Sequence, residues 1–231
     1  MSARVIRKPF WGARIDTDYV SASCPESWPI VASGHVSDSL SDRPVVSLEA
    51  TRRRLTEKQA ETVDRLTRAA MEVLSREGFA GLTVRMVAAS AGVGTATAYT
   101  YFSSKEHLVA EMFWRRLAST PLPQLEDADS TVRVVAALRQ IAMLMADEPA
   151  LAGAVTSALL GTDPDVAHLR LRIGAEIRQR LIDALGADAD PEVVDTLEML
   201  YAGALLRAGM GYASYAEIAD LLEKSALRAL R

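Results

Sequence analysis

Apolar residues recur every three to four positions along most of the chain beyond residue 56, which is the period of a helix that buries one face. The first apolar stripe consists of Val63, Leu66, Ala70, Val73 and Leu74. Thr56 and Gln59 form a capping pattern before this stripe and Gly78 follows it, so a first helix is expected over residues 57–78. No segment alternates apolar and polar residues as a strand does, and an all-α fold is predicted.

Polar caps mark the next three helix starts. Thr83 is expected to cap a short second helix, and residues 95–101 are expected to form a third. Ser103 and Glu106 have the spacing of a capping box, which predicts a fourth helix ending near residue 119.

Proline marks most of the later starts. A fifth helix is expected over residues 130–146. Pro149, Pro164 and Pro191 suit a first helical position, because proline has no N–H to leave unbonded there. They predict helices over residues 149–160, 164–185 and 191–210. Ser214 with Glu217 is expected to open the last helix, which ends near residue 230.

The second and third helices have the spacing of a helix-turn-helix. Ala88 is small enough for two helices to cross closely, and Gly92, four residues on, suits the left-handed turn between them. Val93 and Ala98 are expected to hold the third helix against the second. The side chains left to face outward, where a recognition helix reads DNA, are Thr95, Ala96, Thr97, Tyr99 and Thr100.

The segment TVRMVAASAGVGTATAYTYFSSKEHL, residues 83–108, resembles the DNA-binding segment of the tetracycline-repressor (TetR) family of bacterial transcription factors. Gly94, Ala96 and Ala98 depart from the usual pattern, which bears on the operator sequence and not on the fold. The resemblance implies a homodimer with a three-helix N-terminal helix-turn-helix domain and a larger helical ligand-binding and dimerisation domain. We assign these to residues 51–119, with the motif at about 83–102, and to residues 120–231.

Each DNA-facing residue has a predicted role. The resemblance places phosphate contacts at Thr97, Tyr99 and Lys105, and the hydroxyls of Thr83 and Tyr101 suit the same purpose. Arg85 is the best guanidinium nearby for a base edge, and residues 52–54 form an arginine arm for the backbone or minor groove. The alternatives are that Tyr99 and Tyr101 only pack the small domain and that Lys105 is a solvated charge.

The charge distribution agrees with DNA binding at one end. The chain of 231 residues carries a net charge of −4, but residues 51–118 hold 11 basic and 7 acidic residues, so that segment has +4 and the remainder −8. One cysteine and three scattered histidines predict no disulfide, metal or cofactor. No apolar run is long enough for a membrane span, no secretory signal is present, and no catalytic constellation is evident, so a cytoplasmic protein without enzymatic activity is expected.

The N-terminal residues 1–50 have no sustained period and contain several prolines, glycines and serines. They are interpreted as a disordered extension, with Trp11 and Trp28 as candidate anchors for a partner or for the DNA. The alternative is a translation start assigned too far upstream.

Methionine and aromatic residues in the larger domain predict a ligand pocket, because methionine adapts to irregular apolar shapes. The candidates are Phe113, Trp114, Met143, Met145, Leu159 and Met199. Ordinary core packing is the alternative for each. Residues 145–163 and the arginine-bearing helix after them weakly resemble regulators of sterol and acyl-CoA catabolism such as KstR. Acyl-CoA or a lipid-like molecule is therefore one candidate ligand, with phosphates at Arg170, Arg172, Arg178 and Arg180, although a solvated helix face is favoured for these arginines.

The last two helices are expected to form the dimer contact through Val194, Leu197, Tyr201, Leu205, Ile218, Leu221 and Leu222, with Gly203, Ala204, Ala208 and Gly209 allowing close approach. Closing the monomer core is the alternative. The leading prediction is a homodimeric repressor that leaves a pseudo-palindromic operator when a small hydrophobic effector binds, with the fourth helix as the lever. The alternatives are a ligand-independent architectural protein and an all-helical enzyme.

Overall fold

The computed structural model describes residues 57–125, 127–187 and 189–231, and these residues form nine α-helices and no strand, which confirms the all-α prediction. The predicted arginine arm at residues 52–54, the Thr56 cap and the N-terminal extension lie outside the described residues. The described residues all belong to one compact unit.

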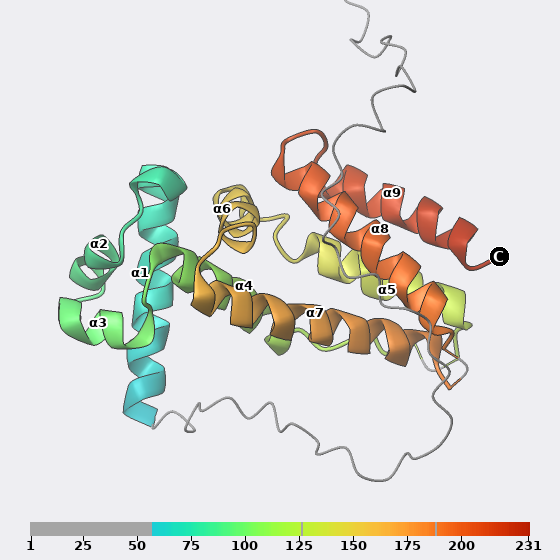
Figure 1. Cartoon of the computed structure of the whole chain (residues 1–231), viewed down its shortest axis with the longest axis horizontal. Helices are drawn as coiled ribbons and strands as arrows, with labels where there is room; N and C mark the ends of the chain where they lie inside the picture. The colour runs from blue at the N-terminus through green and yellow to red at the C-terminus, as the bar shows by residue number, and fades with distance from the viewer. Residues whose placement is uncertain (1–56, 126, 188) are drawn as a thin grey trace, which may run out of the picture. The chain divides into compact units, whose positions relative to one another are not determined.

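The first three helices form a small group that we call the head: α1 (Glu57–Gly81), α2 (Val84–Ser90) and α3 (Thr95–Tyr101). The helical path of α1 is interrupted at Gly78, whose φ of 67° is left-handed, as the predicted stop there requires. Thr83 caps α2 by accepting a hydrogen bond from the Met86 N–H at 3.2 Å, which confirms that cap. In Figure 1, α2 and α3 lie beside α1, and α1 packs against α2.

The helix α4 (Lys105–Ser119) leads from the head to five further helices, which we call the body: α5 (Ser130–Met143), α6 (Pro149–Leu159), α7 (Pro164–Leu185), α8 (Pro191–Gly209) and α9 (Tyr215–Ala229). The three predicted proline starts and the capping box of Ser214 and Glu217 are confirmed. Helix α5 ends three residues earlier than predicted, because a turn separates Met143 from Pro149.

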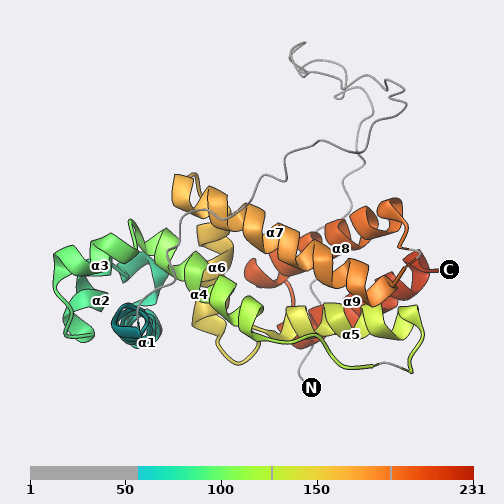
Figure 2. The same cartoon turned by 90° about the horizontal axis from the view of Figure 1, so that it is seen from below.

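The buried core is continuous from the head to the body. Leu66 and Leu74 of α1, Leu108 and Leu117 of α4, and Leu181 of α7 are all fully enclosed. Helix α6 contacts both α1 and α4, and α4 also runs along α7. In Figure 2, α4 and α6 lie between the head and the group formed by α5, α8 and α9, and α7 extends from near α6 along that group. The head and the body are therefore joined by packed helices.

Candidate nucleic-acid interface and ligand cavity

The face of α3 that was predicted to read DNA is turned outward, as expected. Ala98 is fully buried and holds α3 against the head, while Ala88 is fully buried where α2 and α3 cross. Gly92 has a φ of 62°, which only glycine adopts without strain. The predicted outward residues are all exposed: Thr95, Ala96, Thr97, Tyr99 and Thr100. Tyr99 exposes 49% of its surface, so its ring is available to a partner.

The other predicted DNA-facing residues differ in availability. Arg85 is exposed, and no ion pair or hydrogen bond among the described residues engages its guanidinium. Thr83 is exposed, but its hydroxyl already caps α2. Tyr101 is half-buried and packs on the core, so much of its ring serves the fold. Contact of any of these residues with DNA stays a prediction.

Lys105, at the start of α4, contacts the end of α1, which the sequence did not predict. Its Nζ donates hydrogen bonds to the carbonyls of Phe79 at 3.0 Å and Ala80 at 3.3 Å, and it lies 4.7 Å from the centre of the Phe79 ring. The cation thus satisfies carbonyls at the end of α1, which a helix leaves without intrahelical partners. Lys105 fixes α1 to the start of α4, and its contact with a DNA phosphate stays a prediction.

The predicted capping box at the start of α4 is wrong. Ser104, and not Ser103, is the cap, and its Oγ accepts the His107 N–H at 2.9 Å. Ser103 Oγ instead donates to Asp165 Oδ2 at 2.5 Å and lies 3.1 Å from His107 Nδ1. The partner of Ser103 is 62 residues away in sequence, so no local pattern indicated it.

Asp163 completes this contact at the start of α7. Its carboxylate accepts the N–H groups of Asp165 and Val166, which caps α7 as predicted. Burial raises the pKa of Asp163, but a hydrogen bond from Ser104, the two backbone bonds and nearby His107 outweigh burial and hold that pKa below its usual range. We call Ser103, Ser104, Asp163 and Asp165 the α4–α7 latch. It joins the residues that follow α3 to the first turn of α7.

A largely apolar cavity of about 250 Å³ lies within the body and is lined by residues of α4 to α9. Of the predicted ligand residues, Phe113, Met145 and Leu159 line it. Trp114, Met143 and Met199 do not: Trp114 packs under Arg172, whose guanidinium carbon lies 4.4 Å from the ring centre. Met143 and Met199 are 41% and 69% exposed. The periodic spacing of apolar residues did not predict which face of each helix lines the cavity.

Several lining residues were not predicted as part of the apolar pocket, and of these only Arg170 was proposed as a ligand contact, to a phosphate. Arg170, Ile173 and Ile177 share one face of α7 at spacings of three and four residues, a pattern that was available in the sequence. Tyr201 and Tyr215 also line the cavity, and the buried Tyr201 hydroxyl has no hydrogen-bond partner among the described residues. Burial raises the pKa of Tyr201 well above its usual range, with a contribution from Tyr215 that Arg180 opposes.

The arginines of α7 form contacts and are not a merely solvated face. Arg170 Nη2 donates to the Gly161 carbonyl at 2.7 Å, and Arg178 pairs with Asp195 and Glu198 of α8. Arg180 is buried, donates through Nη2 to the Leu117 carbonyl at 2.7 Å, and pairs with Glu176. Only Arg170 of the four predicted phosphate ligands lines the cavity.

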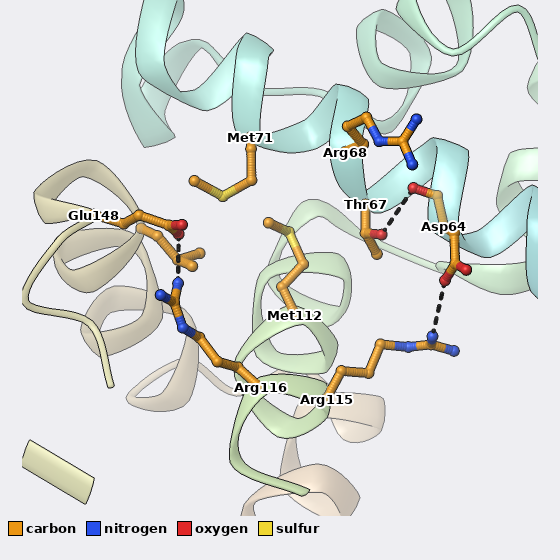
Figure 3. A pocket seen from close by; sticks show the side chains of 9 residues that line it. Asp64, Thr67, Arg68, Met71, Met112, Arg115, Arg116 and Glu148 are labelled. Carbon is orange, nitrogen blue, oxygen red and sulfur yellow. Dashed lines mark hydrogen bonds and ion pairs between the residues drawn. The ribbon is translucent and has the colours of Figure 1, made fainter. Parts of the chain in front are cut away.

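A second, more open cavity of about 380 Å³ lies where α1, α4 and α6 meet. Figure 3 shows Met71 and Met112 pointing toward each other at its centre. Two ion pairs flank them: Arg116 to Glu148 at 2.8 Å joins α4 to the start of α6, and Arg115 to Asp64 at 3.5 Å joins α4 to α1 (Figure 3). This second cavity therefore lies where the head contacts α4 and α6.

Most of the residues predicted for dimer contact are buried within the monomer, which supports the alternative that they close its core. Val194, Leu197 and Tyr201 of α8 and Ile218 and Leu222 of α9 are all enclosed. The large apolar side chains that remain exposed on or beside these two helices are Met199, Met210, Tyr212, Leu221 and Leu227.

Within the described ranges, no helix is both long and apolar enough to span a bilayer, and no group of three potential metal ligands occurs.

Comparison with known proteins identifies the relatives of this chain. The family model described as bacterial regulatory proteins, tetR family, matches residues 66–112. Uncharacterized HTH-type transcriptional regulators of Mycobacterium tuberculosis and Mycobacterium bovis are 47% identical over 167 residues, which is 71% of this chain and 78% of each relative.

Solved structures share the fold. A TetR transcriptional regulator from Rhodococcus sp. RHA1 has a TM-score of 0.62 at 22% identity, over 76% of this chain and 98% of its own. Thermus thermophilus FadR, a TetR-family transcriptional repressor solved in complex with lauroyl-CoA, has a TM-score of 0.53 at 22% identity, over 73% of this chain and 95% of its own. The KstR-like branch stays a prediction.

Proposed function

We propose that this chain, which belongs to the tetR family of bacterial regulatory proteins, is a homodimeric repressor that a small apolar effector releases from its operator. Membership of the family makes it a DNA-binding transcriptional regulator. The observation that carries the finer proposal is the α4–α7 latch, because α7 lines the body cavity and also holds the segment that follows the recognition helix.

We assign the DNA contacts to the exposed side of the head. Thr97 and Tyr99 supply hydroxyls to phosphates, and the small residues Thr95, Ala96 and Thr100 approach base edges and thymine methyl groups. Arg85 on α2 offers a guanidinium for a base edge or a phosphate. Thr83, Tyr101 and Lys105 lie close to this surface in sequence but have structural contacts as well.

Two heads are needed to read an operator, and this is the physical argument for a dimer. A two-fold dimer presents two recognition helices to successive major grooves about 34–36 Å apart, whereas one helix reads a half-site only. The exposed Met199, Leu221 and Leu227 of α8 and α9 are candidates for the isologous contact, because lone apolar side chains of this size gain by leaving water. In this assignment residues 51–119 bind DNA and residues 120–231 hold the ligand and the dimer contact.

The effector acts by population shift. A ligand that binds the cavity more tightly when the two heads are wrongly spaced lowers the fraction of dimers able to reach adjacent grooves. The effector can shift the equilibrium between the two states only by the difference between its binding free energies for them. Because α7 touches both the cavity and the latch, a change in cavity width moves the start of α4 and with it α3.

The test is a titration in which the purified full chain is added to labelled DNA from upstream of its own coding sequence. Binding is measured as the change in fluorescence anisotropy of the DNA. Thr97→Ala should weaken binding about fivefold, since one hydrogen bond to a charged phosphate is lost. Thr196→Ala removes the same hydroxyl from α8, where it donates to the carbonyl of Glu192, and should leave affinity unchanged. Equal affinity for upstream and random DNA would overturn the proposal. Specific binding that no apolar compound alters would favour a ligand-independent regulator.

A further inference from the structure

The body cavity has a single charged residue on its wall. Phe113, Ile141 and Met145 supply apolar surface from α4, α5 and the turn after α5, and Arg170 supplies a guanidinium from α7. No aspartate or glutamate of the described residues lines the cavity. Its remaining polar groups are the hydroxyls of Thr156, Tyr201 and Tyr215, which carry no charge at neutral pH.

Arg170 lies at the mouth of the body cavity, because it is one of the solvent-exposed residues that line it. Leu160 and Arg170 are both exposed lining residues, and Leu160 exposes 68% of its surface. Phe113 and Ile141 are almost wholly enclosed and form the floor. Along α7 the wall runs from Arg170 to Ile177, and seven residues of helix span about 10 Å. An occupant therefore has its charged end near Arg170 and its apolar end about 10 Å deeper.

The charge of Arg170 is not compensated within the described residues. Its Nη2 donates to the Gly161 carbonyl at 2.7 Å, which fixes the guanidinium beside the mouth. No ion pair of the described residues includes Arg170, whereas Arg178 and Arg180 of the same helix are paired. The other N–H groups of the guanidinium remain available, and a planar fork of donors suits a carboxylate. A cation at this position would be repelled.

Volume limits the size of the apolar part. An apolar cavity of roughly 150 Å³ holds benzene, so about 250 Å³ corresponds to roughly ten non-hydrogen atoms. An eight-carbon carboxylate has this size. A coenzyme A thioester does not fit within the cavity, because its nucleotide part alone is several times larger.

We propose that the effector is a compact monocarboxylate whose apolar body, a chain of about eight carbons or one aromatic ring, fills the cavity while its carboxylate meets Arg170. The proposal deepens the proposed function and rests on it for any consequence at DNA. Binding to the cavity itself is independent of DNA.

The test compares three ligands of equal length and different charge by calorimetry on the full chain without DNA. Octanoate should bind about fivefold more tightly than octan-1-ol, the order expected for one partly exposed ion pair, and octylamine should bind most weakly. Among straight-chain acids, affinity should rise from hexanoate to octanoate and stop rising by dodecanoate. Equal affinity for octanoate, octan-1-ol and octylamine would overturn the proposal.

Substitutions of two α7 arginines test whether the ligand carboxylate binds at Arg170. Arg170→Gln should abolish the advantage of octanoate over octan-1-ol, and Arg170→Lys should retain most of it. Arg172→Gln is the matched control, since Arg172 lies on the same helix but packs on Trp114 outside the cavity. It should retain the full advantage. If Arg172→Gln removes the advantage and Arg170→Gln does not, the assignment is wrong.

The two proposals fail in different ways. If octanoate binds in the predicted order but leaves DNA affinity unchanged, the carboxylate site stands and effector-released repression is overturned. If a larger or neutral compound releases DNA while octanoate shows no preference, repression stands and the carboxylate site is overturned.

Discussion

Ser103 donates a hydrogen bond of 2.5 Å to the carboxylate of Asp165, and this bond joins the segment after the recognition helix to the first turn of α7. A second bond, from Arg180 to the Leu117 carbonyl at 2.7 Å, joins the other ends of the same two helices. Since residue 103 meets 165 and residue 117 meets 180, α4 and α7 run parallel and are fixed at both ends. We infer that the lever between cavity and DNA consists of both helices and not of α4 alone.

Removing the charge at Asp165 should uncouple the cavity from the head. Asp165→Asn weakens the bond from Ser103, which we expect to reduce the effector-induced loss of DNA affinity about fivefold, because one partly exposed charged hydrogen bond is weakened. The measurement is the ratio of operator affinities with and without saturating effector. Asp183→Asn is the control, since Asp183 is exposed on α7 and, among the described residues, accepts a hydrogen bond only from Gln179 of its own helix. An unchanged ratio in Asp165→Asn would remove the latch from the mechanism.

Lys105→Ala should lower both stability and DNA affinity. Two carbonyls at the end of α1 lose their donor, so we expect the free energy of unfolding to fall by about 1–2 kcal/mol in a urea titration. If Lys105 also meets a phosphate, the slope of log affinity against log salt should become shallower by about one. Lys224→Ala removes an equal charge from the exposed side of α9 and should leave the slope unaltered. A slope that is the same in Lys105→Ala would restrict Lys105 to a structural role.

Tyr201→Phe should stabilise the protein. The hydroxyl is buried without a partner among the described residues, so its removal should raise the free energy of unfolding by about 1 kcal/mol. Burial raises the folded-state pKa of Tyr201 above the unfolded value of about 10, so the wild type should lose stability as pH rises beyond about 10. The variant should lose less over the same range. Tyr212→Phe alters an exposed tyrosine and should change neither quantity; a less stable Tyr201→Phe would show that the hydroxyl has a partner.

Gly209→Ala should destabilise the contact between α6 and α8. A Cβ at residue 209 would overlap the side chain of Thr156, and relieving such overpacking costs about 1–3 kcal/mol. Gly174→Ala is the matched control, because a Cβ there meets nothing within 4 Å and alanine favours the helix by about 1 kcal/mol. Thermal unfolding of both variants should shift in opposite directions. Adding Thr156→Ala should restore much of the loss in Gly209→Ala, and no recovery would argue against this contact.

Acid should weaken the start of α7 through Asp163. The folded-state pKa of Asp163 lies below its unfolded value of about 3.9, so its contribution to stability is complete above about pH 4 and is lost as pH falls through the folded-state pKa. Asparagine caps a helix about as well as aspartate but does not titrate. In chemical unfolding between pH 5 and 2, Asp163→Asn should therefore show a shallower loss of stability than the wild type. Parallel curves would contradict this role.

The helices and the exposed face of α3 followed from the sequence alone. Thr83, Asp163 and Ser214 cap helices through bonds to residues two or three positions away, so their side chains act where the sequence pattern places them. The outward residues of α3 were predictable for the same reason, because the position of Ala98 on a short helix decides which side is buried. Short-range geometry determines both.

Only the tertiary structure decided what depends on neighbours far apart in the chain. Ser103 has the spacing of a cap but bonds to Asp165 instead, and Met199 resembles a pocket residue but is exposed. The cavity exists because side chains of six helices leave space between them, and Arg170 faces it because α7 docks at one rotation and not another. The helix period fixes how residues are distributed around each helix, whereas packing against other helices fixes which side faces the core, the cavity or the solvent.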